Sequence, residues 1–415
     1  MSSLVPEGWE IKTLSDVTHN LDGKRVPLKS TDRALRRGRY RYFGASGVID
    51  YVDDYIFDGE YILLGEDGEN VLSRVLPLAF KVSGQFWVNN HAHVMQPTKG
   101  NDIGYICEFL ESLDYSIIAS GSAQPKVTQG ELRKIKVHVP PLPEQQKIAK
   151  ILTSVDEVIE KTQAQINKLK DLKTGMMQEL LTNGIGHTEF KDSPVGRIPA
   201  EWEVRTLLHI CSSKYAIVDG PFGSNLKTEH YRPSGIPVFQ SGFVTSNKFI
   251  EKKYVYVDQS KYDEQKRSSA KAGDILMAKI GMNAGACAII PFNHPVGILA
   301  GNSLKITVDN DVVLSDFILG IIHSMQNTGE IRRLLTETAQ PAISITTLKK
   351  MNIPVPPIEE QKRIVNTFHS IDNKIDIEIN RLNSRKQLKK ALMQDLLTGK
   401  VRVKTETTNT EVAVS

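Results

Sequence analysis

The chain contains two copies of one sequence unit, and this internal repeat limits the available folds more than any single motif does. Three pairs of segments match. Residues 5–14 (VPEGWEIKTL) match residues 198–207 (IPAEWEVRTL) at an offset of 193. At an offset of 216, residues 139–146 (VPPLPEQQ) match 355–362 (VPPIEEQK), and residues 177–182 (MQELLT) match 393–398 (MQDLLT). A chain that repeats itself in this way is expected to fold as two similar units.

Each unit begins with a segment rich in short strand-like runs. Runs such as Tyr61–Leu64 and Gly273–Met277 follow turn residues, which is typical of strands. The proline pairs at 140–141 and 356–357 end the preceding run, because proline cannot donate a hydrogen bond to a sheet. The sequence therefore predicts an α+β protein with two similar mixed α/β heads built on short strands.

A long helical pattern follows each head. Its apolar positions recur at alternating spacings of four and three, which is typical of a coiled-coil seam. The predicted seam residues are Ile148, Leu152, Val155, Ile159, Ile166 and Leu180 in the first helix, and Ile364, Phe368, Ile371, Ile375, Leu382 and Leu396 in the second. Each stripe has two explanations: it packs on its own head, or the two helices pair. The stripe exceeds 30 residues and has matching lapses in both copies, which favours pairing, and the chain order then predicts an antiparallel, pseudo-two-fold arrangement.

These patterns define six segments of the chain. They are a first head (1–142), a first long helix acting as a spacer (143–183), a linker (184–197), a second head (198–358), a second long spacer helix (359–399) and a disordered tail (400–415).

Composition places the chain among soluble globular proteins. Hydrophobic residues make up 40% and charged residues 24%, and no run of about 18 apolar residues predicts a membrane span. The first residues lack a secretory signal, and the three cysteines have no CxxC spacing, so we expect reduced thiols and a cytoplasmic location. The net charge of +4 is too small to establish a nucleic-acid partner, so local clustering has to decide.

One cluster of basic residues stands out in the first head. Residues 24–41 carry eight basic residues and a single acid, Asp32, which is the charge needed to neutralise phosphates. The alternative is a solvated charged loop. We expect double-stranded DNA contacts from Lys24, Arg25, Arg33, Arg36, Arg37, Arg39 and Arg41.

The second head offers a weaker signal. Residues 220–227 (GPFGSNLK) combine glycine turns with Ser, Asn and Lys donors, which suits an anion such as phosphate, although a plain β-turn explains the segment equally well. Further basic residues follow among several acids. The predicted DNA contacts here are Gly223, Ser224, Asn225, Lys227, Lys248, Lys266 and Arg267.

Motifs for catalysis are missing from the sequence. It has no GxxxxGK[ST] phosphate loop, no GxGxxG segment after a strand and no NPPY-like methyltransferase tetrapeptide. His91 and His93 lack nearby ligands that would complete a metal site, and the acidic run 66–69 is better explained as a turn than as a nuclease site. We therefore expect a non-catalytic chain with no metal site.

The repeated sequence segments resemble those of the specificity subunits of Type I restriction-modification systems. The resemblance rests on the two Pro-x-x-Trp openings, the two Val-Pro-Pro-[Leu/Ile]-x-Glu-Gln junctions, the two helix ends, and the segments 22–27, 42–47 and 220–224 within the heads. It implies that each head recognises one half of a split DNA target. The helices would set the spacing and dock two methyltransferase subunits, to which restriction subunits are added. This chain would bind no cofactor itself, and S-adenosylmethionine, Mg²⁺ and ATP would belong to the partners.

Two other functions are open at this point. One is a two-headed protein–protein adaptor without DNA specificity, whose binding need not weaken with salt as DNA binding does. The other is a self-contained DNA-modifying enzyme, which would transfer methyl groups or cleave DNA without partners.

Overall fold

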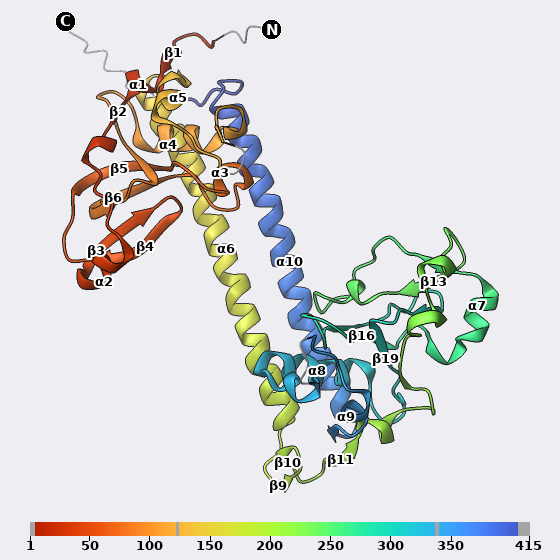
Figure 1. Ribbon diagram of the computed structural model, residues 1–415. Coiled ribbons are helices and arrows are strands. Elements are labelled where there is room, and N and C mark those ends of the chain that lie inside the picture. Colours follow the sequence, from red (N-terminus) through yellow and green to blue (C-terminus); the bar gives the residue numbers. More distant parts are fainter. Residues whose placement is uncertain (1–4, 122–123, 337–339, 406–415) are drawn as a thin grey trace, which may run out of the picture. The chain divides into compact units, whose positions relative to one another are not determined.

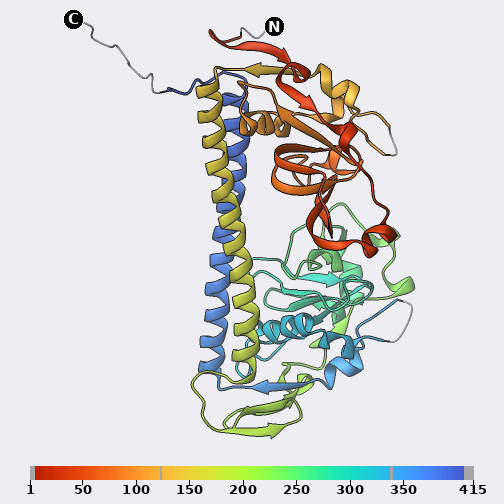
Figure 2. The same ribbon diagram turned by 90° about the vertical axis from the view of Figure 1, so that its left-hand side faces the viewer.

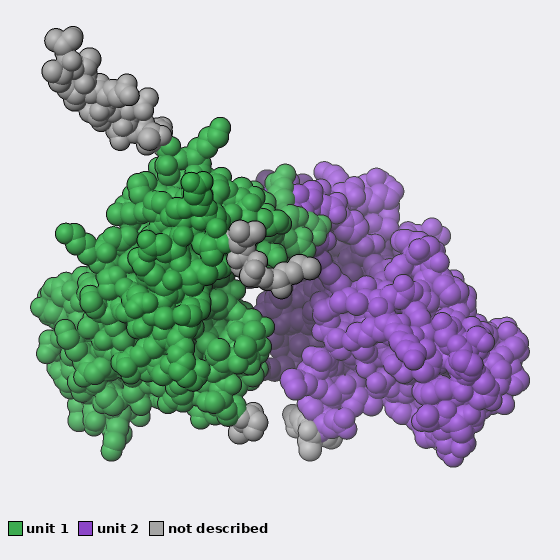
Figure 3. Space-filling view, turned by 90° about the horizontal axis from the view of Figure 1, so that it is seen from above, with its two compact units in different colours: residues 1–164, 379–415 green, residues 165–378 purple. Residues whose placement is uncertain are grey.

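The computed structural model describes residues 5–121, 124–336 and 340–405, apart from the side chain of Ser224. The chain forms two compact units (Figure 3): unit 1 comprises residues 1–164 and 379–415, and unit 2 comprises residues 165–378. We call the part of unit 1 that precedes the first long helix head 1. Head 2 is the part of unit 2 between the two long helices.

Head 1 is built on a six-stranded sheet (Figure 1). Its strand order is β2 (Thr18–Asn20), β7 (Ala92–Pro97), β5 (Phe57–Gly65), β6 (Ala79–Val88), β3 (Arg37–Gly44) and β4 (Gly47–Val52). The β5–β6 pair contains Gly59 opposite Gly84, both at positive φ, a conformation that glycine adopts without steric cost. Glycines at such a place allow a long strand pair to bend.

Short helices and one further strand pair complete head 1. Strand β1 (Glu10–Thr13) pairs with β8 (Lys136–Val139), which joins the Trp9 opening to the strand before the first long helix. The remaining helices are α1 (Leu14–Val17), α2 (Ser30–Leu35), α3 (Asn70–Ser73), α4 (Ile103–Ser112) and α5 (Gln129–Lys134).

Head 2 contains two four-stranded sheets. The first has the order β12 (Ile217–Asp219), β19 (Ser303–Ile306), β16 (Ile275–Ala278) and β17 (Cys287–Ile289), and the second has the order β14 (Tyr256–Val257), β13 (Ile236–Phe239), β18 (Gly297–Leu299) and β15 (Ser269–Ala270). Strand β11 (Glu203–Thr206) pairs with β20 (Asn352–Val355), as β1 does with β8. The helices are α7 (Gln259–Glu264), α8 (Ser315–Thr328) and α9 (Ile345–Lys349).

The two heads share one antiparallel strand pattern. Strands β2, β7, β5 and β6 of head 1 follow the same order and directions as β12, β19, β16 and β17 of head 2. The heads differ mainly between the first and third of these strands, where head 1 has residues 21–56 and head 2 has the longer segment 220–274. The prediction of two similar heads is therefore confirmed.

Two long helices, α6 (Leu142–Thr182) and α10 (Ile358–Leu396), have 41 and 39 residues. In each unit their segments lie side by side and run antiparallel (Figures 1 and 2). Lys389 pairs with Asp156 in unit 1, and Lys173 pairs with Asp372 in unit 2. The two residue numbers of each pair add up to the same total, as is expected when regular helices pack antiparallel.

The predicted seam residues are largely buried. Nine of the twelve are buried, and Val155, Ile159 and Leu180 are half-buried. The helix ends also belong to the head cores: Ile148 and Leu152 of α6 and Leu396 of α10 lie in the core of unit 1, as Ile364 and Phe368 of α10 do in the core of unit 2. The two explanations of the stripe therefore both apply, to different parts of it.

Two segments outside the heads and helices carry more structure than the sequence suggested. The expected linker contains a hairpin, β9 (Phe190–Ser193) with β10 (Gly196–Pro199). In the expected tail, Arg402 hydrogen-bonds Glu144 and Val403 packs against the core of unit 1, whereas residues 406–415 lie outside the described residues. None of the helices in the described part of the chain is both long and apolar enough to cross a membrane.

Candidate nucleic-acid interface

The repeated Trp and Glu residues form equivalent structural junctions between head and helix. Trp9 Nε1 donates to Glu144 Oε2 at 3.1 Å, and Trp202 Nε1 donates to Glu360 Oε2 at 3.0 Å. Both glutamates are buried and receive a second partner from the chain that follows a long helix. For Glu144 this partner is the Arg402 guanidinium at 2.7 and 2.8 Å. For Glu360 it is the Ile185 amide at 2.8 Å together with the His187 ring.

The glutamine next to each glutamate completes the junction. Gln145 donates to the Pro140 carbonyl and accepts from the Asp102 amide at the start of α4, both at 2.8 Å. Gln361 likewise donates to the Pro356 carbonyl at 2.9 Å and accepts from the Leu314 amide before α8 at 2.9 Å. The repeated Pro-Pro-x-x-Glu-Gln segment is thus explained by hydrogen bonds that fix each head on its helices. The interface must be sought elsewhere.

Arg25 of the sequence-predicted cluster lies inside an ion-pair network of head 1. Its guanidinium donates to Glu66 Oε2 and the Ala92 carbonyl, both at 2.8 Å, and only 14% of its side chain is exposed. Burial opposes ionisation of Glu66, but hydrogen bonds from Arg25 and Lys126 lower the pKa of its carboxyl. Arg25 is therefore occupied in fixing the 22–25 turn.

Arg33 and Arg36 are also paired with acids that lie far along the sequence. Arg33 Nε donates to Asp50 Oδ2 at 2.9 Å, and this bond holds the pKa of the Asp50 carboxyl below its usual value. Arg36 forms an ion pair with Asp53 at 2.9 Å. Because β4 and the turn after it bring these acids to α2 and β3, the surface is less positive than the run 24–41.

The other basic residues of the cluster have more exposed positions. Lys24, Arg37 and Arg39 are exposed, and no carboxylate among the described residues pairs with any of them. Arg41 is half-buried and donates to the Ser83 carbonyl. The basic side chains of the cluster that are exposed and have no carboxylate partner in the described residues are therefore Lys24, Lys29, Arg37 and Arg39.

Aromatic rings lie beneath the guanidinium groups of Arg39 and Arg41, which charge counting did not reveal. Arg39 lies 5.0 Å from the centroid of the Tyr40 ring, and the Tyr40 and Tyr55 rings are 5.1 Å apart. Tyr51 on β4 is 52% exposed. A surface of free arginines with tyrosine rings suits a nucleic acid, because guanidinium groups pair with phosphates and guanine edges while rings make flat apolar contacts. The alternation of Arg and Tyr in residues 39–42 was the signal in the sequence.

The predicted residues of head 2 fall into two groups. Gly223, Asn225 and Lys227 lie on one exposed turn, in which Gly223 has a φ of 58°. Lys266 and Arg267 are exposed on a short 3₁₀ turn after α7. The backbone of Ser224 belongs to the first turn, whereas its side chain lies outside the described residues.

Lys248 has a different role from the one its charge suggested. Its Nζ pairs with Asp376 Oδ1 of α10 at 2.7 Å within unit 2. A lysine paired with its own support helix is a weaker candidate for a phosphate contact than an unpaired one.

Two residues that were not among the predicted DNA contacts, Lys279 and Phe222, fix the 220–227 turn. Lys279 Nζ is 4.1 Å from the centroid of the Phe222 ring and donates to Asp219 Oδ2 at 2.5 Å. Phe222 is itself 45% exposed. The turn after β12 is therefore fixed against the turn after β16 by one lysine.

The His and acidic residues near the 22–25 turn serve the same network. The His93 ring lies 2.6 Å from Asp22 Oδ2 and 2.8 Å from the Val127 carbonyl, and the His91 ring lies 2.8 Å from Asp67. Over the described ranges, no group of three His, Cys, Asp or Glu side chains could hold a metal ion. The acidic run 66–69 is thus a turn held by ion pairs.

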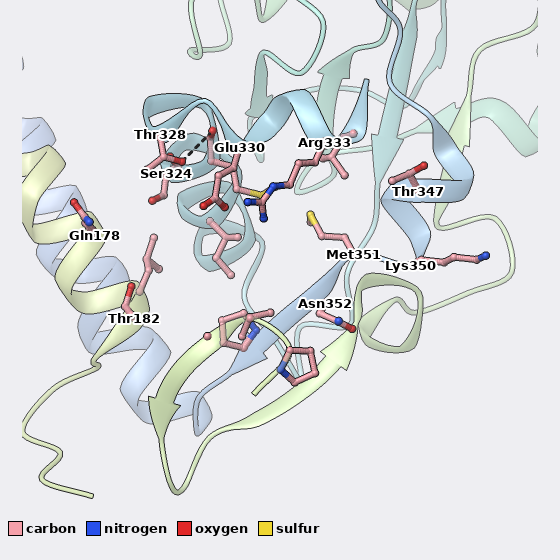
Figure 4. A pocket seen from close by; sticks show the side chains of 18 of the residues that line it. Gln178, Thr182, Ser324, Thr328, Glu330, Arg333, Thr347, Lys350, Met351 and Asn352 are labelled. Atoms are coloured by element: carbon pink, nitrogen blue, oxygen red, sulfur yellow. Dashed lines mark hydrogen bonds between the residues drawn. The ribbon is translucent and has the colours of Figure 1, made fainter. Parts of the chain in front are cut away.

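A cavity of about 770 Å³ in unit 2 lies between α6, α8, α9 and the β9–β10 hairpin (Figure 4). Its walls carry Gln178 and Thr182 of α6, Ser324 and Thr328 of α8, and Arg333, Lys350 and Asn352. None of the predicted DNA contacts lines it. Figure 4 shows hydroxyl, amide and charged groups on these walls.

Comparison with known proteins gives one consistent family. The family model described as "Type I restriction modification DNA specificity domain" matches residues 6–171 and 199–387, one copy in each half of the chain. The type I restriction enzyme MjaVIII specificity subunit of Methanocaldococcus jannaschii is 29% identical over 417 residues, covering 96% of this chain and 94% of that subunit.

Solved structures show the same fold at low sequence identity. The S subunit of a type I restriction-modification system from M. genitalium superposes with a TM-score of 0.57 at 15% identity, covering 94% of this chain and 96% of that one. A chain from a study of complex assembly and conformational transition of the type I R-M system gives a TM-score of 0.58 at 15% identity, covering 96% and 100%.

Proposed function

Because this chain belongs to the type I restriction-modification DNA specificity family, we propose that each of its heads binds one half of a split DNA target. The family's subunits recognise DNA and do not catalyse the reaction, so this chain is a non-catalytic specificity subunit with two target-recognition domains. Its established class implies double-stranded DNA and methyltransferase and restriction subunits as partners.

The observation that carries the proposal is the combination of two similar heads with free basic and aromatic side chains. In head 1 these are Lys24, Arg37 and Arg39 with Tyr40, and in head 2 they are Lys266 and Arg267. Lys227 of head 2 is exposed as well, but its Nζ lies 3.7 Å from Glu229 Oε1. Phosphate neutralisation supplies affinity, and side chains that reach base edges supply specificity. We propose these residues as DNA contacts and exclude Arg25, Arg33 and Arg36 from direct roles.

The number of methyltransferase partners is proposed to be two. Leu172 of α6 and Leu388 of α10 occupy equivalent repeat positions and are 52% and 53% exposed. Each stands next to the lysine that pairs across the helices, Lys173 or Lys389, although Lys389 pairs with Glu108 as well. Two equivalent apolar positions suit two copies of one partner, and S-adenosylmethionine, Mg²⁺ and ATP would be bound by the partners.

The test of DNA binding removes the free arginines of head 1. Arg37→Ala with Arg39→Ala should weaken binding of the cognate duplex and reduce the slope of log K against log salt by about 2, because two phosphate contacts are lost. Titration of labelled DNA over a range of salt concentrations measures both effects. Arg133→Ala with Lys134→Ala removes the same charge from α5 and should leave the slope unchanged. If the slope is unchanged in the Arg37→Ala, Arg39→Ala variant, these arginines do not contact phosphates and belong to a solvated loop.

The adaptor alternative is tested in the same titration. A two-headed protein adaptor would bind DNA without sequence preference, if at all, and competitor DNA of random sequence would displace the target equally well. No observation on the heads favours this function over DNA recognition.

A further inference from the structure

The heads share one turn in which a single projecting position differs in chemistry. In head 1 the Gly68 amide donates to the Pro125 carbonyl at 3.1 Å, and in head 2 the Gly281 amide donates to the Pro341 carbonyl at 2.9 Å. The two glycines have φ values of 98° and 96°. The turn after β5 and the turn after β16 are therefore the same structure.

A second hydrogen bond confirms this equivalence. The Val127 amide donates to the Glu66 carbonyl, and the Ile343 amide donates to the Lys279 carbonyl, both at 2.8 Å. Each turn is thus held on two sides by the segment that follows the repeated Gln-Pro pair. A turn fixed in this way presents its next residue in a defined direction.

The residue that follows the shared glycine is Glu69 in head 1 and Met282 in head 2. Glu69 is exposed, and its side chain forms no ion pair with the described residues. Met282 is 99% exposed, so its whole apolar side chain stands in water. A fixed backbone that holds a fully solvated methionine gains nothing in the free protein, because apolar burial is what stabilises such a side chain.

Basic groups lie beside both positions. In head 1, Lys126 pairs with Glu66 through Nζ at 2.9 Å while 47% of its side chain is exposed, and Lys24 lies beside Arg25 of the same network. In head 2, Lys279 precedes Met282 by three residues, pairs with Asp219 Oδ2 at 2.5 Å and covers the Phe222 ring. Among these lysines, Lys24 is exposed and has no carboxylate partner in the described residues, and such a cation is suited to DNA, whose phosphates flank the base edges.

We propose that the position after the shared glycine is a specificity-determining position in both heads, with Glu69 and Met282 contacting base edges. The heads share a frame but recognise different half-sequences, so a difference in chemistry at a fixed projecting position is what discrimination requires. A carboxylate accepts a hydrogen bond from the exocyclic amine of cytosine, and an apolar side chain contacts the methyl group of thymine. This inference rests on the proposed function.

The test selects bound sequences from a random DNA pool with the full chain and its methyltransferase partners. Glu69→Gln should reduce discrimination on the order of tenfold at one or two adjacent base pairs of the first half only. Met282→Gln should do the same in the second half only, and Met282→Leu should retain the original preference. Thermal melting should be unchanged in all three, because both side chains are exposed.

Matched controls separate this position from the rest of each head. Glu60→Gln changes an exposed acid on β5, and Phe292→Ala removes an 84% exposed ring beyond the other end of the β16–β17 pair. Both should leave the selected sequences unchanged. If the wild-type complex selects two half-sequences and neither Gln variant alters them, the inference is overturned. If the wild-type complex selects no sequence at all, the proposed function fails instead.

Discussion

Lys389 and Lys173 occupy equivalent positions in the repeat, but their surroundings differ. Lys389 of α10 bonds Asp156 of α6 at 2.6 Å and Glu108 of α4 at 3.0 Å, and only 17% of its side chain is exposed. Lys173 pairs with Asp372 alone and is 25% exposed. Burial raises the pKa of Glu108, although Lys389 opposes this shift. One cation therefore holds two acids in unit 1.

Replacing each lysine by methionine should separate the two sites. Lys389→Met leaves one largely buried carboxylate, Glu108, and one half-exposed carboxylate, Asp156, without a cation and should lower the free energy of unfolding by about 3 kcal/mol. Lys173→Met leaves one half-exposed acid and should cost about 1 kcal/mol. Chemical denaturation at neutral pH measures both.

The pH dependence provides the control for this explanation. A carboxylate whose pKa is higher in the folded state binds more protons there, so stability rises as the pH falls through that pKa. Part of the stability lost in Lys389→Met should therefore be recovered as the pH falls from neutrality through the raised pKa of Glu108, because this buried carboxyl then takes up a proton. If both variants lost the same free energy of unfolding at every pH, Glu108 would not contribute to the difference between the two sites.

At the scale of elements, the end of each long helix is fixed by a glycine that meets the head. Gly184 follows α6 with a φ of 66°, and a Cβ there would lie 2.5 Å from Glu360 Oε1 and 2.7 Å from the Trp202 ring. Gly399 follows α10 with a φ of 75°, and a Cβ there would lie 2.4 Å from Pro6 Cγ. Glycine is thus required both for the turn and for the junction.

Alanine substitutions should show the two requirements separately. Gly186 has a φ of 79°, and a Cβ at this position would have no neighbouring atom within 4 Å, so Gly186→Ala should cost about 1 kcal/mol from backbone strain alone. Gly184→Ala adds the collision with Glu360 and Trp202 and should cost about 3 kcal/mol. Thermal melting of both variants is the measurement, and an equal loss would mean that the junction adjusts freely.

For the whole molecule, equivalent junctions predict that the heads are exchangeable. Each head meets its helices through a Trp–Glu bond and a buried Gln, so a related head placed at residues 5–142 or 198–358 finds the same contacts. Such an exchange should change one half of the recognised DNA sequence. Selection from a random pool reports it, and a simultaneous change in both halves would contradict independent recognition.

The long helices are proposed to set the gap between the half-sequences. Inserting seven residues near Gln165 and near Arg381, where the chain passes from one unit to the other, preserves the seam and lengthens each helix by about 10 Å. The preferred gap should grow by about three base pairs while the half-sequences stay the same. The duplex also turns by roughly 100° over this distance, so affinity should fall. Selection of the original gap at full affinity would exclude the helices as the ruler.

The sequence by itself determined the repeat, the two heads, the two long helices and the family. These follow from local pattern, because the heptad spacing, the Pro pairs and the duplicated Trp and Glu-Gln marks each depend on a few neighbouring residues. The helix bounds predicted from Pro and Gly differ from the observed ones by three residues or fewer.

Tertiary structure decided which charged residues are free. Arg25, Arg33 and Arg36 belong to one basic run, yet they pair with Glu66, Asp50 and Asp53, which the folded sheet and the turns around it bring to them from other parts of the chain. Lys248 is likewise paired by Asp376 of a distant helix. Strand pairing, and with it the meeting of charges, depends on contacts between residues far apart in the sequence. A count of neighbouring charges therefore located the cluster in the chain, and only the fold could show which of its members remain available to DNA.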